Sequence, residues 1–111
     1  MITVMEVWHL KPGLEDQALT LMQRMDDMVG PGAHEHPGWC GHARFYRSTA
    51  SRTEVIMVYP WRSRELHEDI MKREEPLLAE FFEEFCAYQR STYYFEELSV
   101  DVEHTAPMNL A

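Results

Sequence analysis

One carboxylate interrupts an apolar row near the start of the chain. Glu6 lies between Val4 and Trp8, and alternate residues of a strand point to the same face. A carboxylate that loses its water in such a place has a raised pKa, which suits it to accept or donate a proton near neutral pH. We therefore predict a catalytic role for Glu6. The alternative is a buried ion pair with an arginine such as Arg44, which would serve structure alone.

Several aromatic side chains are predicted to line a pocket that stacks a flat substrate, with tyrosine hydroxyls to orient it. They are Trp8, Tyr59, Trp61 and Tyr93, and ordinary core packing is the alternative, favoured for Trp61. His67 lies just beside the apolar stripe of a predicted helix. We predict it as a second acid–base group at the pocket mouth, against the alternative of an exposed helix histidine.

The segment around Pro37 is rich in histidine and resembles a metal site only in composition. His34 and His36 flank Glu35, and His42 follows on the next predicted strand. A metal site needs three or four converging ligands, and spacing alone does not establish convergence. Because the segment reads as a loop with Gly and Pro, solvated histidines are the favoured interpretation, and no metal is predicted.

The elements that must position these residues follow from hydrophobic periodicity. Period-two alternation predicts strands, spacings of three and four predict helices, and Gly and Pro mark the breaks. In the first half of the chain we expect a strand over 2–10, a helix over 14–29 that ends at Gly30-Pro31-Gly32, and a hairpin of strands over 39–47 and 53–59. In the second half we expect a helix that is capped by Ser63 and interrupted at Pro76, and a second helical stretch that begins at Pro76. The last expected element is a strand over 92–100.

The resulting order is β-α-β-β-α-β, which is typical of a ferredoxin-like α+β sandwich. We expect one domain over 1–100 and a C-terminal tail over 101–111. The length of 111 residues fits a single domain with a modest core.

Charge and composition limit the classes of binding partner that we expect. Ten Lys and Arg against nineteen Asp and Glu give a net charge of -9, which disfavours nucleic acid and anionic membrane surfaces. No apolar run is long enough to span a bilayer, and the N-terminus lacks the basic region of a signal peptide. We therefore expect a cytoplasmic protein. Cys40 and Cys86 are read as small apolar residues rather than as a disulfide.

The chain resembles the antibiotic-biosynthesis-monooxygenase family of dimeric α+β barrels over about residues 2–98. The matching segments, in order, are Lys11-Pro12-Gly13 after the first strand, Pro37-Gly38 before the second, Phe45-Tyr46-Arg47-Ser48 within it, Trp61 at the end of the third, and Ser63-Arg64-Glu65 at the start of the second helix. The resemblance implies a homodimer with a small-molecule pocket in each subunit. It also implies a cofactor-free oxygenase as one possible activity.

The haem-degrading branch of that family is not the expected one. Its functional positions, an Asn on the first strand and a Trp and a His on the second helix, align here with Glu6, Ile70 and Glu80. We therefore expect no haem, and the lack of a dinucleotide motif predicts no flavin.

Two functional readings remain open at this stage. One is an enzyme, either a monooxygenase or an isomerase or cyclase, that acts on a small aromatic or enolisable metabolite. The other is a dimeric barrel that binds a small hydrophobic ligand without turnover, because fold alone does not fix function.

The homodimer is also predicted from the residues. Both faces of the first and third strands are largely apolar, and two helices cover only one face. A second copy would cover the other face around a two-fold axis. On this reasoning Val7→Lys or Met57→Lys splits the dimer or unfolds the protein, whereas Glu83→Lys does neither.

Overall fold

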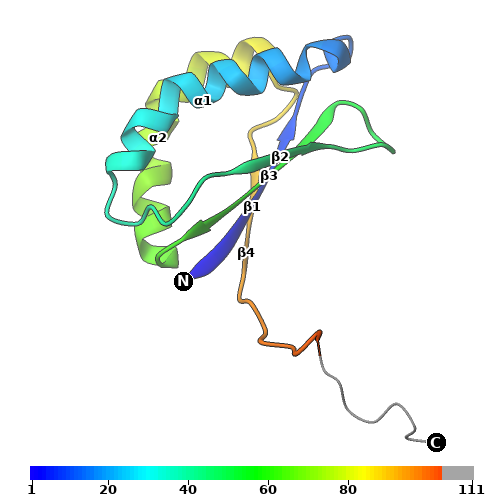
Figure 1. Cartoon of the computed structure of the whole chain (residues 1–111). Helices are drawn as coiled ribbons and strands as arrows, with labels where there is room; N and C mark the ends of the chain where they lie inside the picture. Colours follow the sequence, from blue (N-terminus) through cyan, green and yellow to red (C-terminus); the bar gives the residue numbers. More distant parts are fainter. Residues whose placement is uncertain (104–111) are drawn as a thin grey trace, which may run out of the picture.

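The computed structural model describes residues 1–103, so most of the predicted tail lies outside the described residues. The elements follow the predicted order (Figure 1). They are β1 (Ile2–His9), a 3-10 turn (Glu15–Gln17) before α1 (Ala18–Glu35), β2 (Arg44–Arg47), β3 (Glu54–Trp61), α2 (Arg64–Phe85) and β4 (Ser91–Phe95).

The strands form one four-stranded antiparallel sheet in the order β2-β3-β1-β4. In the register of β1 against β3, Val4 pairs with Tyr59 and Glu6 pairs with Met57. β2 and β3 form the expected hairpin. This strand order, with a helix in each crossover, confirms the ferredoxin-like α+β fold.

The two faces of the sheet have different neighbours, because both helices lie on one side of it (Figure 1). On β1, Val4, Glu6 and Trp8 point toward the helices and are buried. Met5 and Val7 point the other way and are only partly buried. The alternation read from the sequence is therefore confirmed, and it brings Glu6 into the helix-covered interior.

α1 is longer than the periodicity predicts. The expected end was Val29, before Gly30-Pro31-Gly32, but the helix runs on to Glu35. The proline lacks a backbone N–H and each glycine weakens a helix. Packing outweighs this local cost, because Val29 is buried and Ala33 packs against the core beneath the helix.

α2 begins where the sequence places it and continues further. The Ser63 hydroxyl accepts a hydrogen bond from the Leu66 N–H at 3.2 Å, as expected of an N-cap. The predicted interruption at Pro76 is wrong, because the helix is continuous. Glu74 and Leu78, on either side of the proline, are both buried and hold both halves of the helix against the sheet.

β2 is shorter than expected because the chain before it crosses the end of β3. The backbone of Gly38 packs so closely on the Trp61 indole that a Cβ at this position would overlap the ring. Trp39 then makes a single bridge to Trp61 and does not extend the ladder. The segment 38–43 therefore covers the interior at the carboxyl end of β3.

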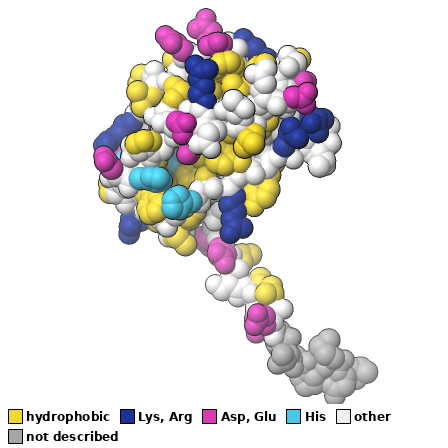
Figure 2. All heavy atoms as spheres, turned by 45° about the horizontal axis from the view of Figure 1, so that its top comes forward, with side chains coloured by type: hydrophobic (Ala, Val, Ile, Leu, Met, Phe, Trp, Pro, Cys, Tyr) yellow, Lys and Arg dark blue, Asp and Glu magenta, His cyan; other side chains and the backbone are white. Residues whose placement is uncertain are grey.

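β4 ends at Phe95, where it pairs with Thr3 near the start of β1. The expected strand to Val100 is too long, since β1 offers no further partner. Residues 96–103 leave the sheet and extend away from the body of the molecule (Figure 2). Within the described part of the chain, no helix combines the length and the apolar character needed to cross a membrane.

Candidate functional site

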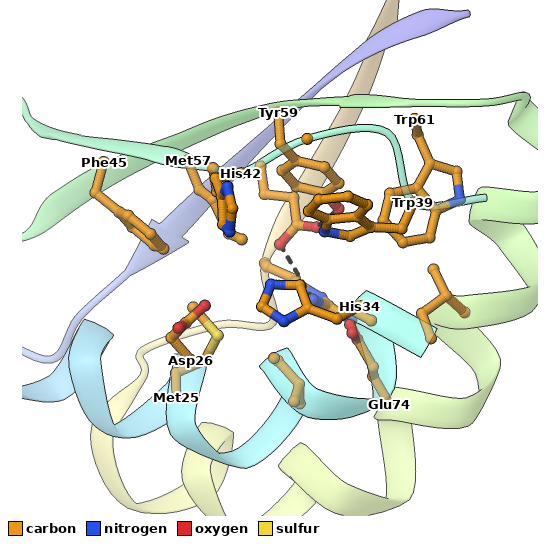
Figure 3. A pocket seen from close by; sticks show the side chains of 18 residues that line it. Met25, Asp26, His34, Trp39, His42, Phe45, Met57, Tyr59, Trp61 and Glu74 are labelled. Atoms are coloured by element: carbon orange, nitrogen blue, oxygen red, sulfur yellow. Dashed lines mark hydrogen bonds and ion pairs between the residues drawn. The ribbon is translucent and has the colours of Figure 1, made fainter. Parts of the chain in front are cut away.

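A cavity of about 160 Å³ lies between the two helices and the sheet (Figure 3). Its walls include aromatic side chains from β2, β3 and the segment between α1 and β2, namely Phe45, Tyr59, Trp61 and Trp39. Ionisable side chains also line it, namely Glu6, Asp26, His34, His42, Glu74 and Arg90. An aromatic wall beside a few polar groups is the usual composition of a small-molecule site.

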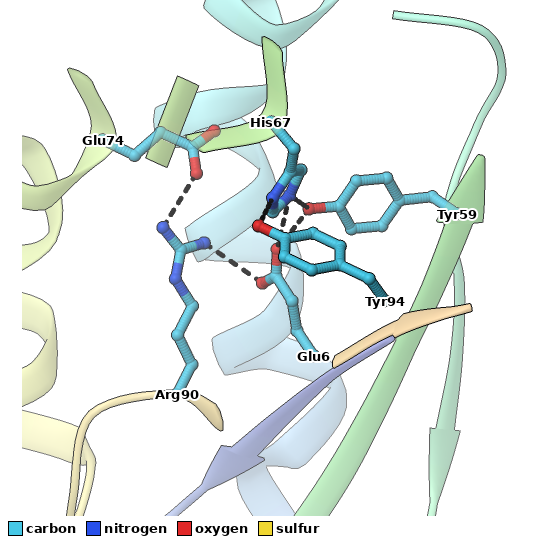
Figure 4. Close-up of polar contacts among 6 residues, drawn as sticks. All are labelled: Glu6, Tyr59, His67, Glu74, Arg90 and Tyr94. Atoms are coloured by element: carbon cyan, nitrogen blue, oxygen red, sulfur yellow. Dashed lines mark hydrogen bonds and ion pairs between the residues drawn. The ribbon is translucent and has the colours of Figure 1, made fainter. Parts of the chain in front are cut away.

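Glu6 stands at the centre of a buried polar network (Figure 4). Only 1% of the residue is exposed. Its Oε2 accepts a hydrogen bond from the Tyr59 hydroxyl, and its Oε1 lies 3.1 Å from an Arg90 guanidinium nitrogen. The arginine partner is therefore Arg90 and not Arg44, which is exposed on the edge strand β2.

His67 is fully buried, so the expectation of a position at the pocket mouth is corrected. Its apolar neighbours on α2 draw that face of the helix onto the sheet. Its Nε2 lies 2.5 Å from the Tyr59 hydroxyl oxygen, and its Nδ1 lies 2.8 Å from the Tyr94 hydroxyl. His67 reaches the cavity only through Tyr59 and Glu6.

With Glu6 ionised and His67 neutral, the donors and acceptors of this network allow one arrangement of protons. An ionised Glu6 only accepts, so the single hydroxyl proton of Tyr59 points to it. The Tyr59 oxygen then accepts from Nε2–H of His67. In the neutral ring, Nδ1 is left to accept from the Tyr94 hydroxyl. A continuous chain of hydrogen bonds thus joins half-buried Tyr94 to Glu6 at the cavity wall.

Arg90 joins Glu6 to a second buried carboxylate. One guanidinium nitrogen faces Glu6, and the other lies 3.0 Å from Oε1 of Glu74. The guanidinium carbon lies 5.4 Å from the centre of the Trp8 ring, in the geometry of a cation–π contact. The two carboxylates share one cation, and an aromatic ring covers it.

Sequence reasoning missed Glu74, because the pair Glu74-Glu75 reads as a solvated acidic face. The helical spacing of Glu74 nevertheless indicated that it is buried. Glu74 falls on the same α2 stripe as the other buried residues of that helix, which are His67, Ile70, Leu78 and Phe81. Arg90 had no such signal, since it lies between α2 and β4 in a segment without periodicity.

The surroundings of Glu74 and Glu6 shift the pKa values of the two carboxyl groups in opposite directions. Burial raises the pKa of Glu74 to about 7, against the opposing charge of Arg90. Burial acts on the pKa of Glu6 in the same direction, but the Arg90 charge and the hydrogen bonds of His67 and Tyr59 outweigh it and lower that pKa. Burial and the Glu6 charge raise the pKa of Tyr59 well above its usual range. Near pH 7, Glu6 is therefore ionised, Tyr59 is a phenol, and Glu74 exchanges a proton.

Of the four aromatic residues predicted to line the pocket, two line the cavity and two do not. Tyr59 and Trp61 line the cavity. Trp8 does not, because it is buried between α2 and the sheet with its ring stacked on Phe82. Tyr93 lies on the opposite face of the sheet and is 48% exposed. Successive residues of a strand point to opposite faces, so Tyr94 takes the inward position expected of Tyr93.

The three histidines near Pro37 do not converge. His36 is buried and structural, with Nε2 at 2.8 Å from an Asp69 oxygen and Nδ1 accepting the Gly38 N–H. His34 and His42 instead contact each other edge to face at the cavity, with ring centres 5.3 Å apart. Among residues 1–103 there is no group of three or more His, Cys, Asp or Glu side chains placed to hold a metal ion.

The sequence matches no protein-family model and no curated protein sequence. The structure, in contrast, is similar to solved structures over nearly their whole length. An antibiotic biosynthesis monooxygenase superposes with a TM-score of 0.62 at 13% identity, covering 88% of this chain and 99% of that chain. SnoaB, a cofactor-independent oxygenase from Streptomyces nogalater, gives a TM-score of 0.62 at 9% identity, with 91% and 96% covered.

A third similar structure is Rv0793 from Mycobacterium tuberculosis, with a TM-score of 0.58 at 17% identity and coverage of 90% and 97%. All three likenesses cover about nine tenths of this chain. The described chain therefore has the α+β fold of the antibiotic biosynthesis monooxygenases.

Proposed function

We propose that the protein is an enzyme that binds a small aromatic or enolisable molecule in the cavity and removes a proton from carbon. The observation that carries this proposal is Glu74, a buried carboxyl group at the cavity wall whose pKa is raised to about 7. A general base works best when its pKa lies near the working pH. The fold shared with a cofactor-independent oxygenase supports the same reading.

Within this proposal Glu74 accepts the proton and Glu6 positions its surroundings. Glu6 has a lowered pKa, so it is the weaker base, although it also lines the cavity. Its ion pair holds Arg90, which in turn holds Glu74. Glu6 and His67 together orient the Tyr59 hydroxyl, the one phenol of the network at the cavity wall.

Oxygenation follows from the carbanion without flavin or haem. A substrate CH₂ group gives a proton to Glu74, and the carbanion passes an electron to O₂. The two radicals combine to a peroxide anion, which takes the proton back from Glu74. Loss of water leaves a carbonyl, so CH₂ and O₂ become C=O and H₂O. The substrate supplies all the electrons in this scheme.

The hydrogen-bond chain from Tyr94 gives the cavity a route for proton exchange with solvent. Tyr94 is the half-buried end of the chain, and Tyr59 is the end at the cavity. A shift of each proton along the chain would deliver one to Glu6 and take one up at Tyr94. His67 is suited to the middle position because imidazole donates through one nitrogen and accepts through the other.

A ligand-binding barrel without turnover is the second candidate function. It is favoured by Glu6, because both of its carboxylate oxygens already have partners, Arg90 and Tyr59, and its pKa is lowered. Such a carboxylate resembles a structural ion pair more than an activated base. Under this reading the network only shapes the cavity.

Turnover separates the two candidates. The molecule retained by the protein is identified by native mass spectrometry after purification from its own host. Oxygen consumption with that molecule is then measured for the wild type, Glu74→Gln and the exposed neighbour Glu75→Gln. We expect Glu74→Gln to lose about 100-fold or more in kcat when the substrate is saturating, and Glu75→Gln to match the wild type. Tight binding without turnover by the wild type would favour the binding module.

We also propose that the working unit is a homodimer built on the open face of the sheet. Large side chains on that face are half exposed in the single chain, among them Tyr46, Tyr93 and Phe95. A second copy would cover them around a two-fold axis. Met57 does not belong to this face, because it pairs with Glu6 and lines the cavity. Its neighbours Ile56 and Val58 take its place in the proposed interface.

A further inference from the structure

Acidic side chains outnumber basic side chains around the cavity. Three carboxyl groups line it, from Glu6, Asp26 and Glu74. Apart from two histidines, the only cationic side chain is Arg90. Arg90 forms ion pairs on both sides, with one nitrogen hydrogen-bonded to Glu6 at 3.1 Å and the other 3.0 Å from Glu74 without a well-aligned hydrogen bond. An anionic ligand would therefore meet no free cation.

Two of the carboxyl groups have unused acceptors directed into the cavity. Glu74 is only 7% exposed and pairs with Arg90 through Oε1. Its Oε2 has no partner among residues 1–103. Asp26 is half-buried on α1, and no described side chain pairs with it. Figure 3 shows both carboxyl groups entering the cavity from the helix side.

The opposite wall of the cavity is aromatic. Tyr59 and Trp61 of β3 line it together with Trp39. Aromatic faces attract cations through their quadrupole, most strongly when water is excluded. Carboxylate oxygens on one side and ring faces on the other make an environment that favours an organic ammonium group.

The volume of the cavity indicates the size of the group that fills it. The cavity measures about 160 Å³. An engineered protein cavity of about 150 Å³ holds benzene. The space therefore matches one ring with a short substituent.

We propose that the cavity selects a small single-ring amine in its ammonium form, bound between the carboxyl groups of Glu74 and Asp26 and the aromatic wall. The inference rests on the proposed function in that it names the ligand class of the same site. It concerns recognition alone, so it is tested without turnover.

Binding of a cation at this place has a consequence for Glu74. Burial raises its pKa to about 7, so protonated and ionised Glu74 coexist near neutral pH. A neighbouring ammonium group favours the ionised form and expels that proton. Charged and titratable groups share the cavity walls around Glu74, namely Glu6, Asp26, His34, Glu35, His36, His42, Tyr59, Arg73 and Arg90.

The test compares three probes of nearly equal shape by isothermal titration calorimetry at pH 7. They are benzylammonium chloride, benzyl alcohol and sodium benzoate. We expect benzylammonium to bind at least tenfold more tightly than benzyl alcohol, and benzoate to be weakest. Repeating the titration in buffers of different ionisation enthalpy should show that protons are released when benzylammonium binds.

Matched variants locate the effect. Glu74→Gln should abolish the proton release and the preference for the cation, whereas Glu75→Gln, at the exposed next position, should keep both. If Glu74→Gln does not fold, Asp26→Asn against Asp27→Asn tests the same preference. Equal affinity for benzyl alcohol, tighter binding of benzoate, absence of binding by all three probes, or unchanged proton release in Glu74→Gln would overturn the proposal. Cation binding without catalysis of any retained molecule would instead count against the proposed enzyme alone.

Discussion

The two faces of the sheet reverse the usual distribution of polar and apolar side chains. The helix-covered face buries Glu6, Glu74 and Arg90 beside its aromatic core. The open face, which meets solvent in the single chain, displays Tyr93 and Phe95. Buried charges and exposed aromatic residues are both costly for a monomer that only has to fold. The contrast supports the two proposals, that the covered face carries the ligand chemistry and that the open face mediates association.

Removing Arg90 should have the largest effect on the covered face. Arg90→Met leaves Glu6 and Glu74 buried without a cation, and an unpaired buried charge costs about 3–5 kcal/mol. We expect a loss of that size in the free energy of unfolding, measured by denaturant titration. Arg73→Met is the control, since its pair with Asp69 is exposed and contributes little to stability. Equal losses in the two variants would show that the network does not stabilise the fold.

A charge on the open face should act on association. Val58→Lys places an ammonium group in the proposed interface, and we expect the dimer to dissociate at least 100-fold more readily. Multi-angle light scattering should report a mass near the single-chain 13.1 kDa for this variant and twice that for the wild type. Glu83→Lys, on the exposed face of α2, should leave the mass unchanged. A wild type that already scatters as a single chain would contradict the dimer.

Glu74 should give the covered face a particular pH dependence. Its folded pKa of about 7 lies above the ordinary 4.5, so folding favours the protonated form. The stabilisation is complete below the unfolded pKa and is lost as the pH rises through 7. Between pH 4.5 and 7 the wild type should lose about 3 kcal/mol of unfolding free energy relative to Glu74→Gln. Parallel pH profiles for the two proteins would refute the raised pKa.

Adjacent tyrosines on β4 offer the finest comparison of the two faces. Tyr94→Phe removes the hydroxyl that hydrogen-bonds Nδ1 of His67, and the unpaired nitrogen should cost about 1–2 kcal/mol. Tyr93→Phe, one residue earlier and on the open face, should change stability by less than about 0.5 kcal/mol. Denaturant titration gives both values. ¹⁵N NMR should also show an altered His67 tautomer equilibrium in Tyr94→Phe alone.

The sequence predicted the fold well because the fold depends on periodicity. The alternation of Val4, Glu6 and Trp8 correctly placed a carboxylate in the interior. The ends of elements were less predictable, since the continuation of α1 past Gly30 and of α2 past Pro76 depends on packing that no local pattern records. Local breaker residues weaken a helix but do not end it when both sides are anchored.

The candidate site was only partly accessible from the sequence. Glu6, His67 and Tyr59 were identified separately, but nothing in their spacing showed that they form one hydrogen-bonded chain. Glu74 was not predicted as a buried residue because the exposed Glu75 follows it. Arg90 was not predicted because its segment has no periodicity. Both become visible only when the fold brings α2 and the start of β4 together.

The protonation of Glu74 is the central point on which the cavity chemistry depends. Its carboxyl carbon can be followed by ¹³C NMR as the pH is varied, and its signal is assigned by its loss in Glu74→Gln. A midpoint near pH 7, with Glu6 ionised throughout the same range, is the expected result. A Glu74 midpoint near the ordinary 4.5 would mean that the cavity holds no base poised for proton transfer, and would contradict the proposed function.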